Sequence, residues 1–88
     1  MPSREPGMVR VRVEVRLRQG VTDPEGDNVH KALKLLGFER VRAVHSSKLF
    51  RIDLATKDAK AARKEVEEMC RRLLANPVIH EYEIAVEK

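Results

Sequence analysis

The sequence has little of what disulfide-bonded, membrane-inserted or metal-dependent proteins require. Its 88 residues contain one cysteine, Cys70, and no tryptophan. A single cysteine cannot build a disulfide framework within the chain, which favours a reducing compartment. No apolar run approaches the roughly 20 residues of a membrane span, and the start of the chain lacks the apolar core of a signal peptide. We therefore expect a cytoplasmic protein that has no membrane partner.

Residues that could support chemistry are few and scattered. His30, His45 and His80 lack the close pairing of zinc ligands, and Cys70 has no second cysteine beside it. The four glycines lie too far apart for a phosphate-binding loop. No spacing indicates a Ser-His-Asp or Cys-His set. The sequence therefore predicts no catalytic residue, no metal site and no cofactor-binding residue.

Length and composition describe one small globular domain. Charged residues make up 36% of the chain and hydrophobic residues 42%, with the two signs of charge interspersed. Two prolines and a glycine within residues 1–7 predict a flexible tail, followed by a single domain over residues 8–88. The high charge, with only three Asn or Gln residues, is typical of proteins from thermophiles.

Alternation marks the strands. Over residues 9–18, apolar side chains hold the odd positions and charged ones the even positions, as in a strand with one buried face. Weaker alternation predicts strands at residues 50–54 and 78–87. A short strand near residues 41–44 would precede a hairpin turn at 46–48.

Two helices separate these strands. Asp23 can cap the first helix, with Pro24 at its first position and Gly37 just past its end. The acidic residues around Asp23 are explained by this cap and by the positive end of the helix, without a metal. The second helix covers residues 58–74, and its apolar stripe includes Cys70.

The order β-α-β-β-α-β predicts an α+β fold of the ferredoxin-like type. Right-handed crossovers would place both helices on one face of a four-stranded antiparallel sheet, giving two layers. The first and last strands would be neighbours, so outward arginines of one would face outward glutamates of the other. This arginine row comprises Arg10, Arg12, Arg16 and Arg18.

The arginine row could also bind phosphate or RNA. RNA-binding sheets of this topology need exposed aromatic residues for base stacking, but the chain has only one tyrosine and two phenylalanines. Neighbouring glutamates would neutralise much of the row. We therefore expect a solvated or oligomer-facing surface and no nucleic acid.

Taken in order, these segments resemble the PurS family, the small subunit of phosphoribosylformylglycinamidine synthase. The resemblance covers residues 8–87 and includes the alternating first strand, the helix that ends at Gly37-Phe38, and the run from Glu68 to Glu83. Two surface segments, the corner after Thr22 and the connection after Ala75, could serve as contacts. The candidate partner-contact residues are Asp23, Pro24, Glu25, Gly26, Lys48, Asn76, Pro77, Val78, Ile79 and Tyr82.

The resemblance implies a non-catalytic subunit of an ATP- and glutamine-dependent C–N ligase complex. In such complexes a glutaminase subunit releases ammonia. A larger synthetase subunit then uses ammonia, ATP and Mg²⁺ to convert formylglycinamide ribonucleotide into the amidine, step four of de novo purine biosynthesis. The small subunit would bridge the two and support ammonia transfer, as a homodimer or homotetramer, and would bind no cofactor itself.

Departures from the family keep alternatives open. The family often has a glycine where this chain has Ser47, and acids where it has His80 and near Ala85. Partner contacts that use those acids would have to be made differently here. A small-ligand regulatory module of ferredoxin-like fold remains an alternative, as does a nucleic-acid-binding module, which the scarce aromatic residues disfavour.

Overall fold

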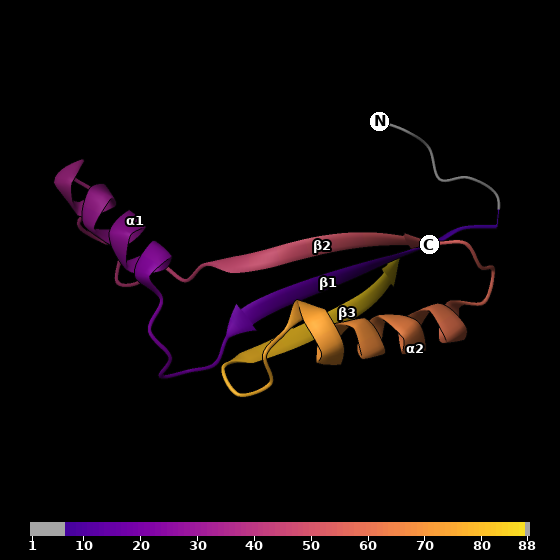
Figure 1. The fold of residues 1–88 in the computed structure, drawn as a ribbon. Coiled ribbons are helices and arrows are strands. Elements are labelled where there is room, and N and C mark those ends of the chain that lie inside the picture. The colour runs from indigo at the N-terminus through magenta and orange to yellow at the C-terminus, as the bar shows by residue number, and fades with distance from the viewer. Residues whose placement is uncertain (1–6, 88) are drawn as a thin grey trace.

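The computed structural model describes residues 7–87, and Figure 1 shows their fold. The elements are, in chain order, β1 (Val9–Leu17), α1 (Pro24–Leu35), β2 (Ser47–Leu54), α2 (Ala59–Met69), a π-helical turn (Cys70–Leu74) and β3 (His80–Glu87). Within residues 7–87 the strands form one antiparallel sheet in the order β2-β1-β3. The predicted α+β class and ferredoxin-like antiparallel arrangement are confirmed. The predicted tail lies outside the described residues, apart from Gly7.

The core lies between α2 and one face of the sheet (Figure 1). The valines of β1 point to this face, and Val11 and Val13 are fully buried. From α2 and the turn that follows, Val66 and Cys70 are buried against them. Burying a valine side chain contributes about 1.5–3 kcal/mol, so this row accounts for much of the stability that so small a domain can have.

The opposite face of the sheet is a charged face, formed by the even-numbered residues of β1 and their neighbours on β2 and β3. Arg10 Nε lies 2.6 Å from Asp53 Oδ1. Arg16 Nη1 lies 2.9 Å from Glu83 Oε1, across the β1–β3 pair. The predicted pairing of the first strand's arginines with the last strand's glutamates is therefore confirmed. Each exposed pair contributes little to stability, but opposite charges across strands favour this register.

The segment before β2 differs from the prediction. Residues 41–46 form no strand, so the sheet within residues 7–87 has three strands and not the predicted four, and the proposed hairpin turn at 46–48 is wrong. Ser47 and Lys48 instead begin β2, where they pair with Arg16 and Val15 of β1. Long-range pairing with β1 overrides the local turn preference of the serines, because it satisfies backbone groups that a turn would leave to water.

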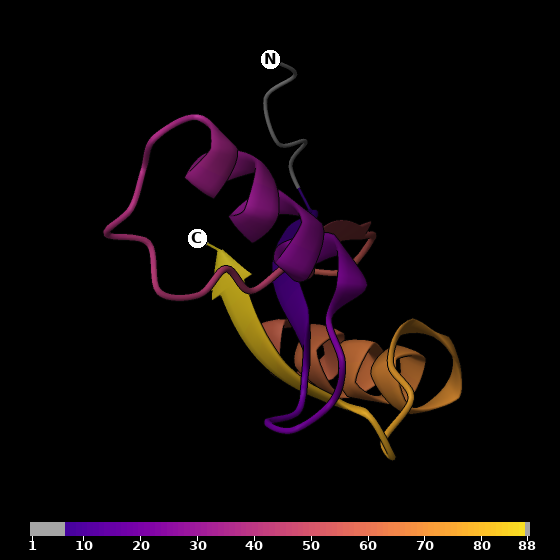
Figure 2. The same cartoon turned by 90° about the vertical axis from the view of Figure 1, so that its left-hand side faces the viewer.

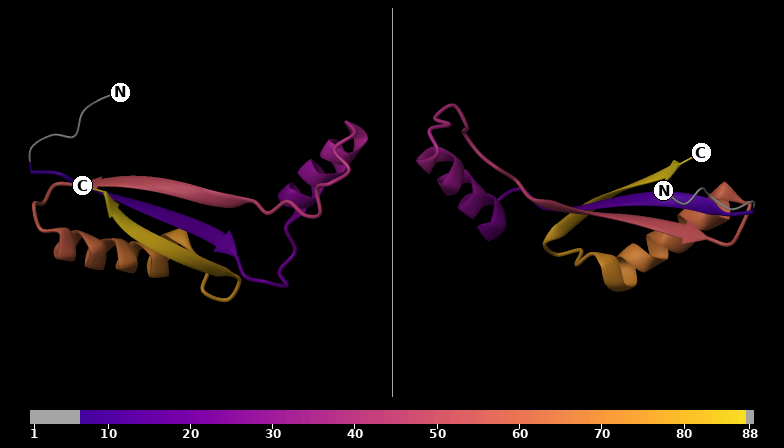
Figure 3. Two further views of the ribbon diagram at one scale, coloured as in Figure 1. Left: turned by 180° about the vertical axis from the view of Figure 1, so that it is seen from behind. Right: turned by 90° about the horizontal axis from the view of Figure 1, so that it is seen from above.

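The prediction that both helices cover one face of the sheet is also wrong in detail. Helix α1 projects beyond the end of the sheet, and only α2 packs on it (Figures 1 and 3). Figure 2 shows α1 and its return segment as a unit apart from α2. We call this unit, residues 24–46, the arm. Its apolar side chains are largely uncovered: Leu36 is 73% exposed and Phe38 56%.

Replacing a buried valine tests the location of the core. Val13→Ala should lower the free energy of unfolding by about 2 kcal/mol, because it removes buried apolar atoms and leaves a cavity. The matched change Val78→Ala, at a residue 79% exposed, should alter it by less than about 0.5 kcal/mol. Urea denaturation of the isolated chain measures both, and equal losses would contradict this core.

Candidate functional site

The base of the arm is held by one carboxylate, that of Asp23. Its Oδ2 accepts a hydrogen bond of 2.7 Å from the Ser46 amide. Its Oδ1 accepts one of 2.9 Å from the Gly26 amide and one of 2.8 Å from Ser46 Oγ. The predicted helix cap is therefore confirmed, and the same side chain joins the start of α1 to the entrance of β2. We call this set of bonds the Asp23 clamp.

The clamp favours the charged form of the carboxyl group. Hydrogen bonds from the Ser46 amide, the Gly26 amide and the Ser46 hydroxyl lower the pKa of Asp23 below its ordinary value. A folded-state pKa that is depressed stabilises the fold above the unfolded-state pKa. That contribution is lost as the pH falls through the folded-state value.

Gly26 permits the close approach that the clamp needs. It is the buried residue of α1, and a Cβ atom there would lie 2.3 Å from the carbonyl oxygen of Val44. It would also lie 2.8 Å from Asp23 Oδ2. Only glycine fits between the helix and the returning chain, so its place in the Asp-Pro-Glu-Gly corner has a structural reason.

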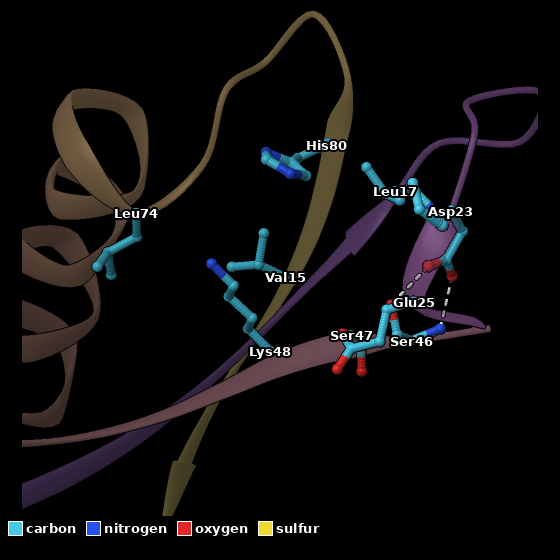
Figure 4. A pocket seen from close by; sticks show the side chains of 10 residues that line it. Val15, Leu17, Asp23, Glu25, Ser46, Ser47, Lys48, Leu74 and His80 are labelled. Carbon is cyan, nitrogen blue, oxygen red and sulfur yellow. Dashed lines mark hydrogen bonds between the residues drawn. The ribbon is translucent and has the colours of Figure 1, made fainter. Parts of the chain in front are cut away.

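A hollow of about 250 Å³ lies between the base of the arm and the body of the protein (Figure 4). Its apolar floor is formed by Val15, Leu17 and Leu74. Its polar rim is formed by Glu25 from α1, Lys48 from β2 and His80 from β3. Asp23 and Pro24 also line it. Four of the ten predicted contact residues therefore meet in one place, although three of them are sequence neighbours.

The connection from α2 to β3 is a stiff turn. The Asn76 carbonyl accepts hydrogen bonds from the Ile79 and His80 amides, at 3.0 and 2.8 Å. Asn76 Oδ1 accepts one of 3.0 Å from the Val78 amide. His80 Nδ1 accepts one of 2.8 Å from the Asn76 amide. These bonds hold Pro77 and Val78 at the surface, where Val78 is 79% exposed.

The remaining predicted residues are less exposed to a partner. Gly26 lies behind the hollow and does not line it. Ile79 is half-buried in the turn just before β3. Tyr82 points to the core face of the sheet, opposite Val15, where it packs against the buried cluster. The candidate contact residues therefore fall into two groups. Those at the hollow and in the turn are accessible to a partner, whereas Gly26 and Tyr82 serve the packing of this chain.

Several residues of this site were not predicted from the sequence. The sequence pattern indicated only core positions for Leu74 and Val15, and only a turn position for Ser46. His80 was noted in the sequence only because the family often has an acidic residue at that position. No other feature of the sequence pointed to it as a site residue. The partnership of Asp23 and Ser46 spans 23 residues, and no local pattern reveals it.

Metal binding and membrane insertion have no support in the described part of the chain. Residues 7–87 contain no group of three or more His, Cys, Asp or Glu side chains placed to hold a metal ion. Neither helix in that range has the length and hydrophobicity needed to cross a lipid bilayer.

Comparisons with known proteins point to one family. Residues 10–88 match the family model described as PurS, phosphoribosylformylglycinamidine (FGAM) synthase. The chain is 51% identical to the PurS subunit of this synthase from Archaeoglobus fulgidus, over 82% of this chain and 90% of that protein. It is 46% identical to the PurS subunit from Methanocaldococcus jannaschii, over 92% and 98%.

Solved structures agree with these matches. The crystal structure of Methanocaldococcus jannaschii PurS superposes with a TM-score of 0.81, covering 91% of this chain and 96% of that one at 45% identity. A chain from the structure of PurLQS of Thermotoga maritima superposes with a TM-score of 0.81 at 25% identity, covering 99% of this chain and all of that one.

Substituting Gly26 tests the close approach at the base of the arm. In an exposed helix, Gly→Ala stabilises by about 0.5–1 kcal/mol. Here Gly26→Ala should destabilise by about 1–3 kcal/mol, because the new methyl group meets backbone. Asn28→Ala on the same helix should be neutral or slightly stabilising. Hydrogen exchange of residues 24–46 measures the local effect, and added protection in Gly26→Ala would contradict the geometry.

Asp23→Asn tests the clamp through pH. In the native chain, the clamp's contribution to stability should begin to fall below the ordinary aspartate pKa of about 3.9, and it should be lost as the pH passes through the lowered pKa of folded Asp23. The asparagine variant should be less stable at pH 7 and lose less on acidification. Asp27→Asn changes a side chain that makes no hydrogen bond with any described residue, so this variant should keep the native acid profile. Urea denaturation at pH 7 and pH 3 compares them; parallel profiles for all three chains would rule out the clamp's contribution.

Proposed function

This chain belongs to the PurS family, the small subunits of phosphoribosylformylglycinamidine synthase, and we propose that it connects the glutaminase and synthetase subunits of that complex. In this role the chain supplies surfaces and no reacting group. The family match over residues 10–88 is the observation that carries the proposal. The likeness to a chain of the Thermotoga maritima PurLQS structure supports assembly with partner subunits.

The chemistry of the complex would take place on the partners. Glutamine hydrolysis would supply ammonia, and ATP with Mg²⁺ would activate formylglycinamide ribonucleotide for amidine formation, in the cytoplasm. This chain would hold the glutaminase and synthetase active sites in a fixed arrangement and support the passage of ammonia from the first to the second. It would bind neither ATP nor Mg²⁺.

Two exposed apolar features support a connecting role. The connection from α2 to β3 presents Val78, and Leu73 in the π-helical turn is 82% exposed. The arm presents Leu36 and Phe38. The hydrogen bonds of the Asn76–His80 turn hold Val78 on rigid backbone, so it loses little entropy on binding and makes an efficient contact.

The arm also supports a homo-oligomer, as a dimer or a tetramer. The chain has a radius of gyration of 16.7 Å, whereas a compact domain of this length has about 12 Å. It exposes 7110 Å², whereas about 5,300 Å² is expected for a compact chain of 10.1 kDa. A 12-residue helix that packs on neither the sheet nor α2 is marginal in water, so we expect a second chain to cover the exposed face of α1.

Reconstitution of the complex tests the proposed function. Glutamine-dependent amidine formation by the glutaminase and synthetase subunits should require this chain, and equal activity without it would refute the role. Val78→Asp should lower that activity at least about tenfold, since a charge would be placed in an apolar contact. Ala55→Asp, at an exposed position elsewhere on the body, should retain native activity.

A further inference from the structure

The hollow at the base of the arm holds opposite charges that do not pair. Lys48 and Glu25 both line it, one from β2 and one from α1. Neither side chain makes a hydrogen bond or ion pair with any described residue, and the two side chains do not pair with each other. Asp23 is different, because three donors from Gly26 and Ser46 already occupy its oxygens. The open carboxylate in this space is therefore that of Glu25.

His80 adds a hydrogen-bond donor, and the ring atom that donates can be named. Its Nδ1 accepts the hydrogen bond from the Asn76 amide, so in the neutral ring the proton must lie on Nε2. No described residue accepts from Nε2. The rim of the hollow thus offers two donors, the Lys48 ammonium and the His80 Nε2–H, together with one acceptor, the Glu25 carboxylate (Figure 4).

The size and floor of the hollow limit what can fill it. Pockets for drug-sized ligands have about 300–1,000 Å³, and this one has about 250 Å³, which is too small for a nucleotide. A phosphate group would also meet the Glu25 carboxylate. The floor of Val15, Leu17 and Leu74 suits a short aliphatic group.

We propose that this hollow binds a free α-amino acid with a short aliphatic side chain. The ligand carboxylate accepts from Lys48 Nζ and His80 Nε2–H, the ligand ammonium pairs with Glu25, and the side chain rests on the apolar floor. One small zwitterion therefore satisfies all three rim groups at once. It also joins α1, β2 and β3, so binding stiffens the attachment of the arm.

Three related probes test the requirement for both charges. L-Norvaline carries the ammonium, the carboxylate and an aliphatic chain, whereas butylamine lacks the carboxylate and pentanoate lacks the ammonium. NMR titration of the isolated full chain should show saturable shifts around residues 23–26, 46–48 and 80 with L-norvaline, at about 0.1–10 mM. Butylamine and pentanoate should bind at least about tenfold more weakly, since each loses a charged hydrogen bond.

Two substitutions assign the rim residues. Lys48→Met and Glu25→Gln should each weaken L-norvaline binding about tenfold. The matched changes Lys57→Met and Glu39→Gln, at exposed positions outside the hollow, should leave it unchanged. Native-like spectra of the variants confirm that the fold is intact.

Several outcomes would overturn the proposal. These are an absence of shifts at the highest L-norvaline concentration, equal binding of a singly charged probe, or native affinity in Lys48→Met. The first two would leave the hollow to a partner's side chain. Since these titrations use the chain alone, a negative result does not affect the reconstitution test of the connecting role.

Discussion

The three hydrogen bonds that converge on Asp23 determine how the two parts of this molecule are joined. The carboxylate caps α1 and at the same time holds the amide and hydroxyl of Ser46, the residue before β2. The chain leaving β1 and the chain returning to β2 therefore meet at one point. The direction of the arm, the close fit at Gly26 and one wall of the hollow all follow from that point.

The body of the fold could be predicted from sequence because its pattern is simple. Residues 9–17 alternate without a break, so the strand and its buried face could both be predicted. The pairing of its outward arginines with acidic residues on a neighbouring strand could also be predicted. The arm was predicted less well. Its helix has good caps, but its large apolar residues are mostly exposed in residues 7–87, and no local pattern states which surface covers a helix. The expected packing of α1 on the sheet came from the ferredoxin-like topology and not from any feature of the helix itself.

The candidate site shows the same limit at the level of single residues. The Asp-Pro-Glu-Gly corner and Lys48 were selected from the sequence, and the structure brings most of them to one hollow. Its floor was not recognised, because Val15 and Leu74 have the same appearance in sequence whether they face the interior or a small cavity. The role of His80 depends on a hydrogen bond with Asn76, which requires the geometry of the turn.

The central position of β1 has a consequence for the order of events during synthesis. This strand is made early, yet it pairs on one side with β2 and on the other with β3, which spans residues 80–87. Contacts between residues so far apart in sequence form slowly, since a long loop must close before they stabilise the chain. One edge of β1 therefore stays unpaired until almost the whole polypeptide has been made. The alternating arginines, by keeping every second side chain charged, help to keep this waiting strand from aggregating.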